Sequence, residues 1–351
     1  MSHLDILVPF GLPPTELARD IGRALHLPGL STLLAKTQPR NPLPDASTRS
    51  DNGFFRSLPH ERWLVSAFDM PGNHAESSPG IAPAAVRRAG IAADDGWWFL
   101  LQPVHLHIAL DHLVLTDLRQ LSVSEHESRA LFDLAAPLFE ESGLPFYYGN
   151  EKEWFVRVDD WCELQTATPD SACGHNIDIW LPKGAAALAW RKLQNELQMT
   201  WFAHPLQEER EARGLKPVNS LWIWGGGSGK EFGITHPYDR VANLPSPLDA
   251  IAPQSQKLDA EGLLNQSPKR GLVVLDNLTE SALAGDWGSW IEHTNKIEAE
   301  WFAPLLDALK KGKVDSLTLL IGDGARLKSW TCSRATLRKF WLKPSLAGLL
   351  A

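Results

Sequence analysis

The sequence predicts an α/β protein that has a mostly parallel, doubly wound sheet and a second, smaller α+β unit. Uninterrupted Val, Leu and Ile runs occur at 271–275 and 316–321, with a long helical pattern between them. Such runs are typical of parallel strands that are covered on both faces. The acids Asp276 and Asp323 follow these runs, at the strand ends where open α/β sheets hold their ligands. The order changes in 121–203, which shows a helix, two strands and a helix and predicts a separate compact unit.

Length and composition limit the function classes. The chain has 351 residues, 44% hydrophobic and 22% charged, which predicts a globular protein of about two domains. Its net charge of −8 argues against a chain built around nucleic acid or anionic lipid. The apolar runs are too short to span a membrane, and the N-terminus shows no secretory signal. With three cysteines and no CxxC pair, we expect a cytoplasmic protein without a disulfide framework.

The individual elements follow from caps and periodicity. Residues 4–10 predict a buried first strand, and Thr15 is expected to cap a helix that runs to Leu25. Ser124 and Glu127 form the pattern of a capping box ahead of a helix. The remaining expectations are strands at 146–148, 154–158 and 220–224, helices at 185–203 and from Asp286, and loops at 37–60 and 69–80. Many of the 15 tryptophans are expected to be half-buried, at domain seams or site walls.

Two short motifs suggest chemistry but are incomplete. The segment 224–231 is similar to a phosphate-binding P-loop, yet Trp224 and Glu231 stand where Gly and Ser or Thr are required. A glycine turn after a buried strand is therefore the favoured interpretation, and its N–H groups are able to face an anion. His105 and His107 share one face of an expected strand, but no third metal ligand can be identified.

The most specific segment is 204–227, in which His204-Pro205 is followed by Arg210, Gly214, Pro217, Asn219, an apolar strand and three glycines. This segment resembles the cofactor-independent phosphoglycerate mutases of the archaeal type. The resemblance is closer to bacterial RpfE-type regulatory proteins, which share the Trp-Ile-Trp-Gly-Gly-Gly run.

The resemblance implies an alkaline-phosphatase-like, three-layer α/β/α core with an inserted α+β domain. Residues 1–103 and 204–351 would form the core, and 104–203 the insert. It also implies a site beyond the strands at 220–224, 271–275 and 317–321. The expected ligand-binding residues are His204, Arg210, Asn219, Gly225, Gly226, Gly227, Asp276, Glu280 and Asp323.

The family's metal site is poorly matched. Active mutases hold two divalent cations with Asp and His ligands and use a Ser as phosphoryl acceptor. Where the resemblance places these ligands, the chain has Pro9-Phe10, Glu280 with Ala284, and Asp323 with Gly324. Ser77 and Ser78 are the nearest candidates for the acceptor. We therefore expect no catalytic residues, no metal ligands and no cofactor.

Three hypotheses remain open. The first is a degenerate mutase-like regulatory protein that binds a small phosphorylated or anionic ligand or a protein partner, with no membrane association. The second is an active mutase or other phosphotransferase whose site is rearranged around His105, His107, Asp276 and Asp323. The third and weakest is a nucleic-acid-binding regulator that uses the basic C-terminal segment, with Trp330, Phe340 and Trp341 for stacking.

Overall fold

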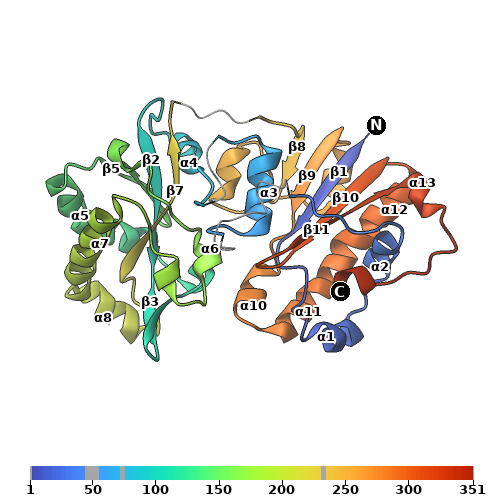
Figure 1. Cartoon of the computed structure of the whole chain (residues 1–351), viewed down its shortest axis with the longest axis horizontal. Helices are drawn as coiled ribbons and strands as arrows, with labels where there is room; N and C mark the ends of the chain where they lie inside the picture. The colour runs from blue at the N-terminus through green and yellow to red at the C-terminus, as the bar shows by residue number, and fades with distance from the viewer. Residues whose placement is uncertain (1, 44–54, 72–75, 231–234, 351) are drawn as a thin grey trace. The chain divides into compact units, whose positions relative to one another are not determined.

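The computed structural model describes residues 2–43, 55–71, 76–230 and 235–350 (Figure 1). The chain divides into two compact units, each with its own sheet. The first unit comprises Met1–Pro44, Pro59–Phe68 and Thr235–Ala351, and the second comprises Asp45–Leu58 and Asp69–Ile234.

The first unit is built on a five-stranded sheet in the order β11-β10-β1-β9-β8. Its strands are β1 (His3–Val8), β8 (Arg240–Ala242), β9 (Arg270–Val274), β10 (Ser316–Gly322) and β11 (Leu327–Ser333). All neighbours pair in parallel except β10 and β11, which form an antiparallel pair at one edge. The carboxyl ends of β1, β8, β9 and β10 therefore meet along one edge, as the alternating pattern predicts.

Helices cover both faces of this sheet, with α2, α11 and α12 on one side and α3 on the other (Figure 1). The α-helices of the unit are α1 (Ala18–Ala24), α2 (Pro28–Ala35), α3 (Pro59–Ala67), α9 (Ala260–Asn265), α10 (Thr279–Leu283), α11 (Trp287–Ile297), α12 (Ala303–Lys311), α13 (Arg334–Leu337) and α14 (Ala347–Leu350). A π-helical turn, Glu298–Phe302, joins α11 to α12, and a 3-10 turn, Leu248–Ile251, follows β8.

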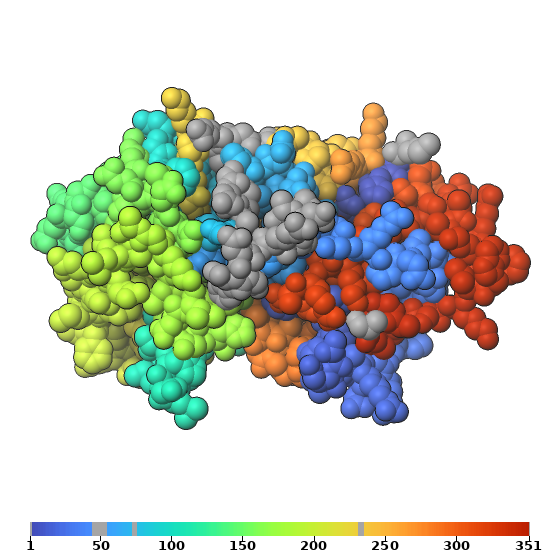
Figure 2. Space-filling view, viewed as in Figure 1, coloured from blue at the N-terminus to red at the C-terminus, as the bar shows by residue number. Residues whose placement is uncertain are grey.

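The second unit has a four-stranded antiparallel sheet in the order β5-β6-β2-β7 and a separate hairpin, β3–β4. Its strands are β2 (Trp97–Val104), β3 (Leu106–Ala109), β4 (His112–Leu115), β5 (Phe146–Asn150), β6 (Glu153–Arg157) and β7 (Ser220–Ser228). Its α-helices are α4 (Ala82–Arg88), α5 (Glu125–Glu141), α6 (Pro169–Ala172), α7 (Ala187–Phe202) and α8 (Pro205–Ala212). The hairpin projects from the unit (Figures 1 and 2), with Ile108, Leu110 and Leu113 exposed along it.

Several local expectations are confirmed. The first strand, the strand pair at 146–158 and the strands near 271–275 and 316–321 are all present. Ser124 caps α5 through a capping box with Glu127, and Asp286 caps α11. The Thr15 cap is wrong: α1 begins only at Ala18, and the Thr15 hydroxyl bonds to the neighbouring Glu16 instead. Much of the two expected loops lies outside the described residues.

The compact units divide the chain at positions other than the expected core and insert boundaries. The strand at 220–224 belongs to β7, which pairs with β2 over Trp97–Val104, and β2 in turn pairs with β6. This strand therefore lies in the sheet of the second unit and not in the sheet of β9 and β10. A fully buried antiparallel strand has the same continuous apolar pattern as a parallel one, so the pattern alone does not assign the sheet.

The tryptophans are more deeply buried than expected. Eleven of the 15 are less than a tenth exposed, and Trp341 at 64% is the most exposed. Helices α5 and α7 cover the four-stranded sheet, and their shared core centres on Trp154, which makes edge contacts with Phe132, Phe146 and Trp201. The indoles around Trp154 fill the core of the second unit.

Each unit contains one buried thiol. Cys332 lies on β11 in the first unit and Cys173 follows α6 in the second, while Cys162 is exposed. Burial raises the pKa of Cys173 to about 12 and raises that of Cys332 as well. Among the described residues, no helix is both long and apolar enough to cross a bilayer.

Candidate functional site

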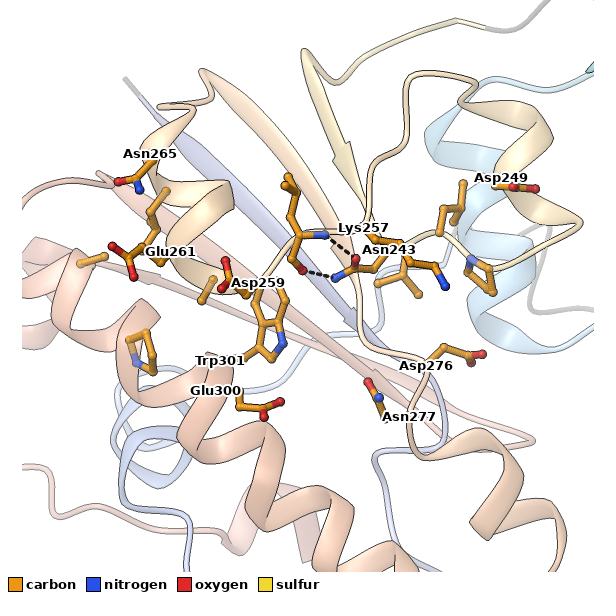
Figure 3. Close-up of a pocket in the computed structure, with 18 of the residues that line it drawn as sticks. Asn243, Asp249, Lys257, Asp259, Glu261, Asn265, Asp276, Asn277, Glu300 and Trp301 are labelled. Carbon is orange, nitrogen blue, oxygen red and sulfur yellow. Dashed lines mark hydrogen bonds between the residues drawn. The ribbon is translucent and has the colours of Figure 1, made fainter. Parts of the chain in front are cut away.

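A pocket of about 1100 Å³ opens at the carboxyl ends of β8 and β9 in the first unit (Figure 3). This is the edge where parallel α/β sheets hold ligands, and the volume is sufficient for a small organic molecule. The pocket is bounded by the segment after β8, by Asp276 and Asn277 after β9, by α9, and by the π-turn with α12. The fold therefore forms a ligand-sized site without any contribution from the second unit.

Local hydrogen bonds fix the wall formed by the segment after β8. Asn243 follows the strand in a left-handed conformation, with a φ of 60°. Its amide group donates to the Leu258 carbonyl oxygen and accepts from the Leu258 N–H, at 2.8 and 2.9 Å. Asp259 then caps α9 by accepting a hydrogen bond from the Gly262 N–H. These bonds hold both ends of the 243–259 loop beside the pocket.

The π-turn supplies the opposite wall. It brings Glu300 and Trp301 to the pocket from consecutive positions, and Figure 3 shows the Trp301 indole between the side chains of Asp259 and Glu300. Trp301 is 6% exposed, and its indole N–H donates no hydrogen bond within the described part of the chain. The exposed edge of the ring is thus pocket surface with one unused donor.

The carboxyl end of β1, at the centre of the same sheet, is closed by aromatic side chains. Phe10 adopts a φ of 53° and is buried against the ring of His60. Its carbonyl oxygen accepts a 2.8 Å hydrogen bond from the indole of the fully buried Trp290. The strand end where the family resemblance places an acidic metal ligand is therefore filled by apolar packing.

The three acidic site candidates of the first unit have different surroundings. Asp276 lines the pocket and accepts a hydrogen bond from the Thr279 hydroxyl. Glu280 is exposed in the first turn of α10. Asp323 closes the β10–β11 turn, because its carboxylate accepts from the backbone N–H groups of Ala325 and Arg326 and pairs with the Arg326 guanidinium at 2.8 Å. Of the three, Asp276 alone belongs to the pocket lining.

These residues do not fit a pair of divalent cations. Among the described residues, no group of three or more His, Cys, Asp or Glu side chains is arranged to hold a metal ion. A two-cation centre requires several carboxylates and imidazoles that converge at strand ends. Here the end of β1 is apolar, Ala284 offers no ligand, and the Asp323 oxygens are already bonded within their own turn.

The remaining site candidates lie in the second unit, where each has an internal partner. His204 caps α8 by accepting from the Leu206 N–H. Arg210 is fully buried and pairs with Glu127, 2.9 Å from Nη1 to Oε2. Its guanidinium also donates to the carbonyl oxygens of Ser122 and Lys216. Arg210 therefore joins α8 to α5. Its internal contacts do not support a role in binding an anionic ligand.

Asn219 and the glycines are also engaged in the fold. The Asn219 side chain accepts from the Leu106 N–H and donates to the Leu106 carbonyl oxygen, both at 2.8 Å. The expected glycine turn is wrong, since Gly225–Gly227 lie inside β7. Gly225 has a φ of 75° where the β2–β7 register shifts, and its N–H donates to the Ser78 hydroxyl. The glycines accommodate a β-bulge rather than an anion.

Replacing Gly226 with alanine is expected to destabilise the second unit by about 1–3 kcal/mol, the range for overpacking a closed site. A Cβ atom there would lie 2.4 Å from Cε1 of Phe99, whose ring is fully buried and cannot move aside. Urea denaturation followed by circular dichroism measures the loss. Gly324→Ala is the control, because a Cβ atom there meets nothing within 4 Å. Equal stability of the two variants would contradict the close packing at Gly226.

The residues of the other two hypotheses do not form sites. His105 and His107 stack at 5.9 Å, but the first bonds to the Pro217 carbonyl oxygen and the second to Thr116, and burial lowers the pKa of His105. The proposed stacking role of Trp330 is wrong, because that ring is 1% exposed. Phe340 and Trp341 are exposed, as expected.

The acceptor candidates also have internal partners. Ser77 accepts from the Thr166 N–H, and Ser78 is buried against the Thr166 hydroxyl. His74, a histidine close to these serines in the sequence, and Glu231 of the segment similar to a P-loop lie outside the described residues.

The sequence indicated Asp276 but missed the rest of the pocket. Asp249, Asp259, Glu261 and Glu300 come from three different segments, and no local motif connects these segments. The one available signal was the Asp259-Ala-Glu-Gly262 pattern of a helix start, which places one acid at the N-cap of α9 and one in its first turn.

Comparison with known proteins shows which sequences the chain resembles. No protein-family model matches the chain. A probable 2,3-bisphosphoglycerate-independent phosphoglycerate mutase from Geobacter sulfurreducens is 27% identical over 139 residues, and the mutase of that name from Methanosarcina barkeri is 25% identical over 176 residues. These alignments cover 39% and 49% of this chain but 35% and 43% of the relatives, so the chain matches less than half of their length.

Two solved structures can be aligned with most of the chain. The PH0037 protein of Pyrococcus horikoshii is aligned over 95% of this chain and 87% of its own, with a TM-score of 0.50 and 11% identity. The cofactor-independent phosphoglycerate mutase of Thermoplasma acidophilum is aligned over 100% and 94%, with a TM-score of 0.43 and 13% identity. The chain thus has the mixed α/β fold that the sequence predicts and that PH0037 shares, and its sequence is similar to that of 2,3-bisphosphoglycerate-independent phosphoglycerate mutases.

Proposed function

We propose that this chain is a phosphoglycerate-mutase-like protein that does not catalyse metal-dependent mutation and instead acts as a regulatory, ligand-binding protein. We also propose that the chain is an RpfE-type regulatory protein and that it is cytoplasmic. Fold similarity does not itself support activity, because function depends on the residues of the site.

The observation that carries the proposal is the end of β1. Phe10 and Trp290 occupy the strand end where a carboxylate would have to reach a cation, and the Phe10 carbonyl oxygen is bonded to the Trp290 indole. Restoring a ligand there would require an acid in an apolar, buried position, which is unfavourable unless a cation compensates the charge. The pocket beside β8 and β9 remains open, which favours binding over catalysis.

The two alternatives have less support. A rearranged phosphotransferase site would need the side chains of His105, His107, Asp276 and Asp323. Each of these side chains already has a hydrogen-bond partner in its own unit. Nucleic-acid binding loses Trp330 as a stacking residue, and the net charge of −8 opposes it.

The test is a coupled assay with 3-phosphoglycerate and added Mn²⁺, with elemental analysis of the same protein sample. We expect no turnover and no stoichiometric metal. Turnover in the usual enzymatic range of about 1–10³ per second would overturn the proposal if Asp323→Ala abolished it. Asp133→Ala, which removes an exposed carboxylate of α5, is the control for the loss of one acid.

A further inference from the structure

A chain of hydrogen bonds links a serine, a histidine and a buried aspartate at the amino ends of β1 and β10. Ser316 Oγ lies 2.7 Å from Nδ1 of His3, and Nε2 of the same ring lies 3.0 Å from Oδ1 of Asp5. His3 and Ser316 are direct neighbours across the parallel pair of strands, and Asp5 follows two residues later on the same face of β1. A nucleophile, a base and a group that orients the base, each within hydrogen-bond reach of the next, form the arrangement used in nucleophilic catalysis.

The hydrogen-bond partners assign the tautomer of the imidazole. An ionised carboxylate can only accept hydrogen bonds, so Asp5 places the proton of a neutral His3 ring on Nε2. Nδ1 then carries the lone pair and accepts from the Ser316 hydroxyl. Thr318 Oγ1 lies farther from Nε2, at 3.3 Å, and bonds to Thr331 at 2.9 Å, so it leaves Nδ1 to Ser316. The basic nitrogen of the ring therefore faces the serine.

Asp5 is a costly residue at its position. It lies in the central strand of the five-stranded sheet at 6% exposure, where parallel strands are ordinarily apolar. The hydroxyl of Tyr238, a side chain that is itself 3% exposed, donates to Oδ2 of Asp5 at 2.9 Å. The carboxylate is thus held on both sides and shielded from water, as is the carboxylate that orients the histidine in a catalytic triad.

The hydrogen-bonded chain reaches solvent at the nucleophile. The His3 side chain is 29% exposed and Ser316 is half-buried, close to the start of β1 at the end marked N in Figure 1. The cross-strand neighbours on this face of the sheet are polar: Thr331 is exposed, and Thr318 and Ser333 are half-buried. A small electrophile in solution can therefore approach the Ser316 hydroxyl.

We propose that Ser316 is a nucleophile, activated by His3 and oriented through Asp5, that takes the acyl group of small activated esters. Ser316 Oγ bonds to the acyl carbon, its proton passes to Nδ1 of His3, and the ester C–O bond breaks to release an alcohol that takes this proton. Water then attacks the acyl-serine, with His3 again as the base, and releases the carboxylic acid and the free serine. The activity is additional to the proposed ligand binding, because the pocket lies at the carboxyl ends of the strands.

The test is hydrolysis of p-nitrophenyl acetate by the full chain, with mass spectrometry of protein that is acid-quenched during turnover. We expect an acetyl group on Ser316, and we expect Ser316→Ala and His3→Gln each to lower the rate about 10²-fold, as for loss of a nucleophile or its general base. His3→Gln keeps hydrogen-bonding groups but accepts no proton. The matched control is Ser142→Ala, which removes an exposed serine hydroxyl that bonds to the Leu138 carbonyl oxygen.

Several results would overturn the proposal. They are hydrolysis no faster than in buffer, an unchanged rate in Ser316→Ala, an equal loss in Ser142→Ala, or acetyl groups on other residues with none on Ser316. Circular dichroism of each variant shows whether its fold is retained. If His3→Gln does not fold, Ser316→Ala decides the question, because it removes a single oxygen atom. The result is independent of the mutase assay, which tests the proposed function alone.

Discussion

Replacement of Glu127 with alanine is expected to lower the free energy of unfolding by about 3–5 kcal/mol, the cost of leaving a buried charge without its partner. Glu127 is 3% exposed and forms an ion pair with Arg210 at 2.9 Å. It also accepts hydrogen bonds from the Arg213 guanidinium at 2.7 Å and from the Ser124 N–H at 2.8 Å. The alanine substitution removes the carboxylate and leaves the Arg210 guanidinium buried without its ion-pair partner. Urea denaturation of the variant and of the wild type gives the difference.

Two further variants test the cause. Lys192→Ala breaks the exposed pair with Glu196 on α7 and should change stability by less than about 0.5 kcal/mol. The double variant Glu127→Gln/Arg210→Met removes both charges and should be more stable than Glu127→Ala. If Glu127→Ala were no more damaging than Lys192→Ala, the buried pair would not hold α5 to α8.

The same carboxylate should make the stability of the chain depend on pH. Burial opposes ionisation of Glu127, but the Ser124 hydrogen bonds and the charge of Arg210 outweigh it, so its pKa lies below the ordinary value. Its ionised form therefore contributes stability above the unfolded pKa of about 4.3, and that contribution is lost as pH falls through the lower folded value. In Glu127→Gln this part of the acid dependence should be missing.

Replacement of Trp154 with alanine should cost about 3–5 kcal/mol, as for other large-to-small changes in a packed core. The side chain is fully buried, stands edge-on to Phe132, Phe146 and Trp201, and donates to the Ser128 hydroxyl at 3.1 Å. Its loss leaves a cavity between α5 and the sheet and removes one hydrogen bond of the Ser128 hydroxyl. Thermal unfolding followed by circular dichroism measures the effect.

Trp341→Ala is the matched control for that experiment. The ring is 64% exposed, so its removal should change the melting temperature little. Similar melting temperatures for the two variants would show that the core around Trp154 adapts to the cavity, contrary to the expectation for a rigid aromatic cluster.

Local chemistry made part of the fold predictable. Ser124 with Glu127, and Asp286 ahead of Trp287, specify helix starts through hydrogen bonds within a few residues. The runs at 271–275 and 316–321 indicate buried strands, because they are short, continuous and apolar and a helical pattern separates them. Each of these signals is complete within its own segment.

The errors concern features decided by distant partners. The strand at 220–224 pairs with β2, more than a hundred residues earlier, and its apolar pattern contains no information about that choice. The glycines after it suggested a turn, whereas Phe99 and the shift in register across the sheet explain them. The resemblance implied that Arg210 binds a ligand, but Arg210 is paired instead with Glu127 on another helix. The pocket likewise depends on four segments that meet only after folding.

The buried cysteines allow the opening of each unit to be followed by the rate of thiol labelling. Cys332 and Cys173 react with a thiol reagent only when β11 or the segment after α6 opens, while Cys162 reacts at once. The labelling rates of the two buried positions therefore measure the opening of the two units independently, in one sample and without added probes. Their ratio would tell whether the units open together or one at a time, and whether a bound ligand slows the first alone.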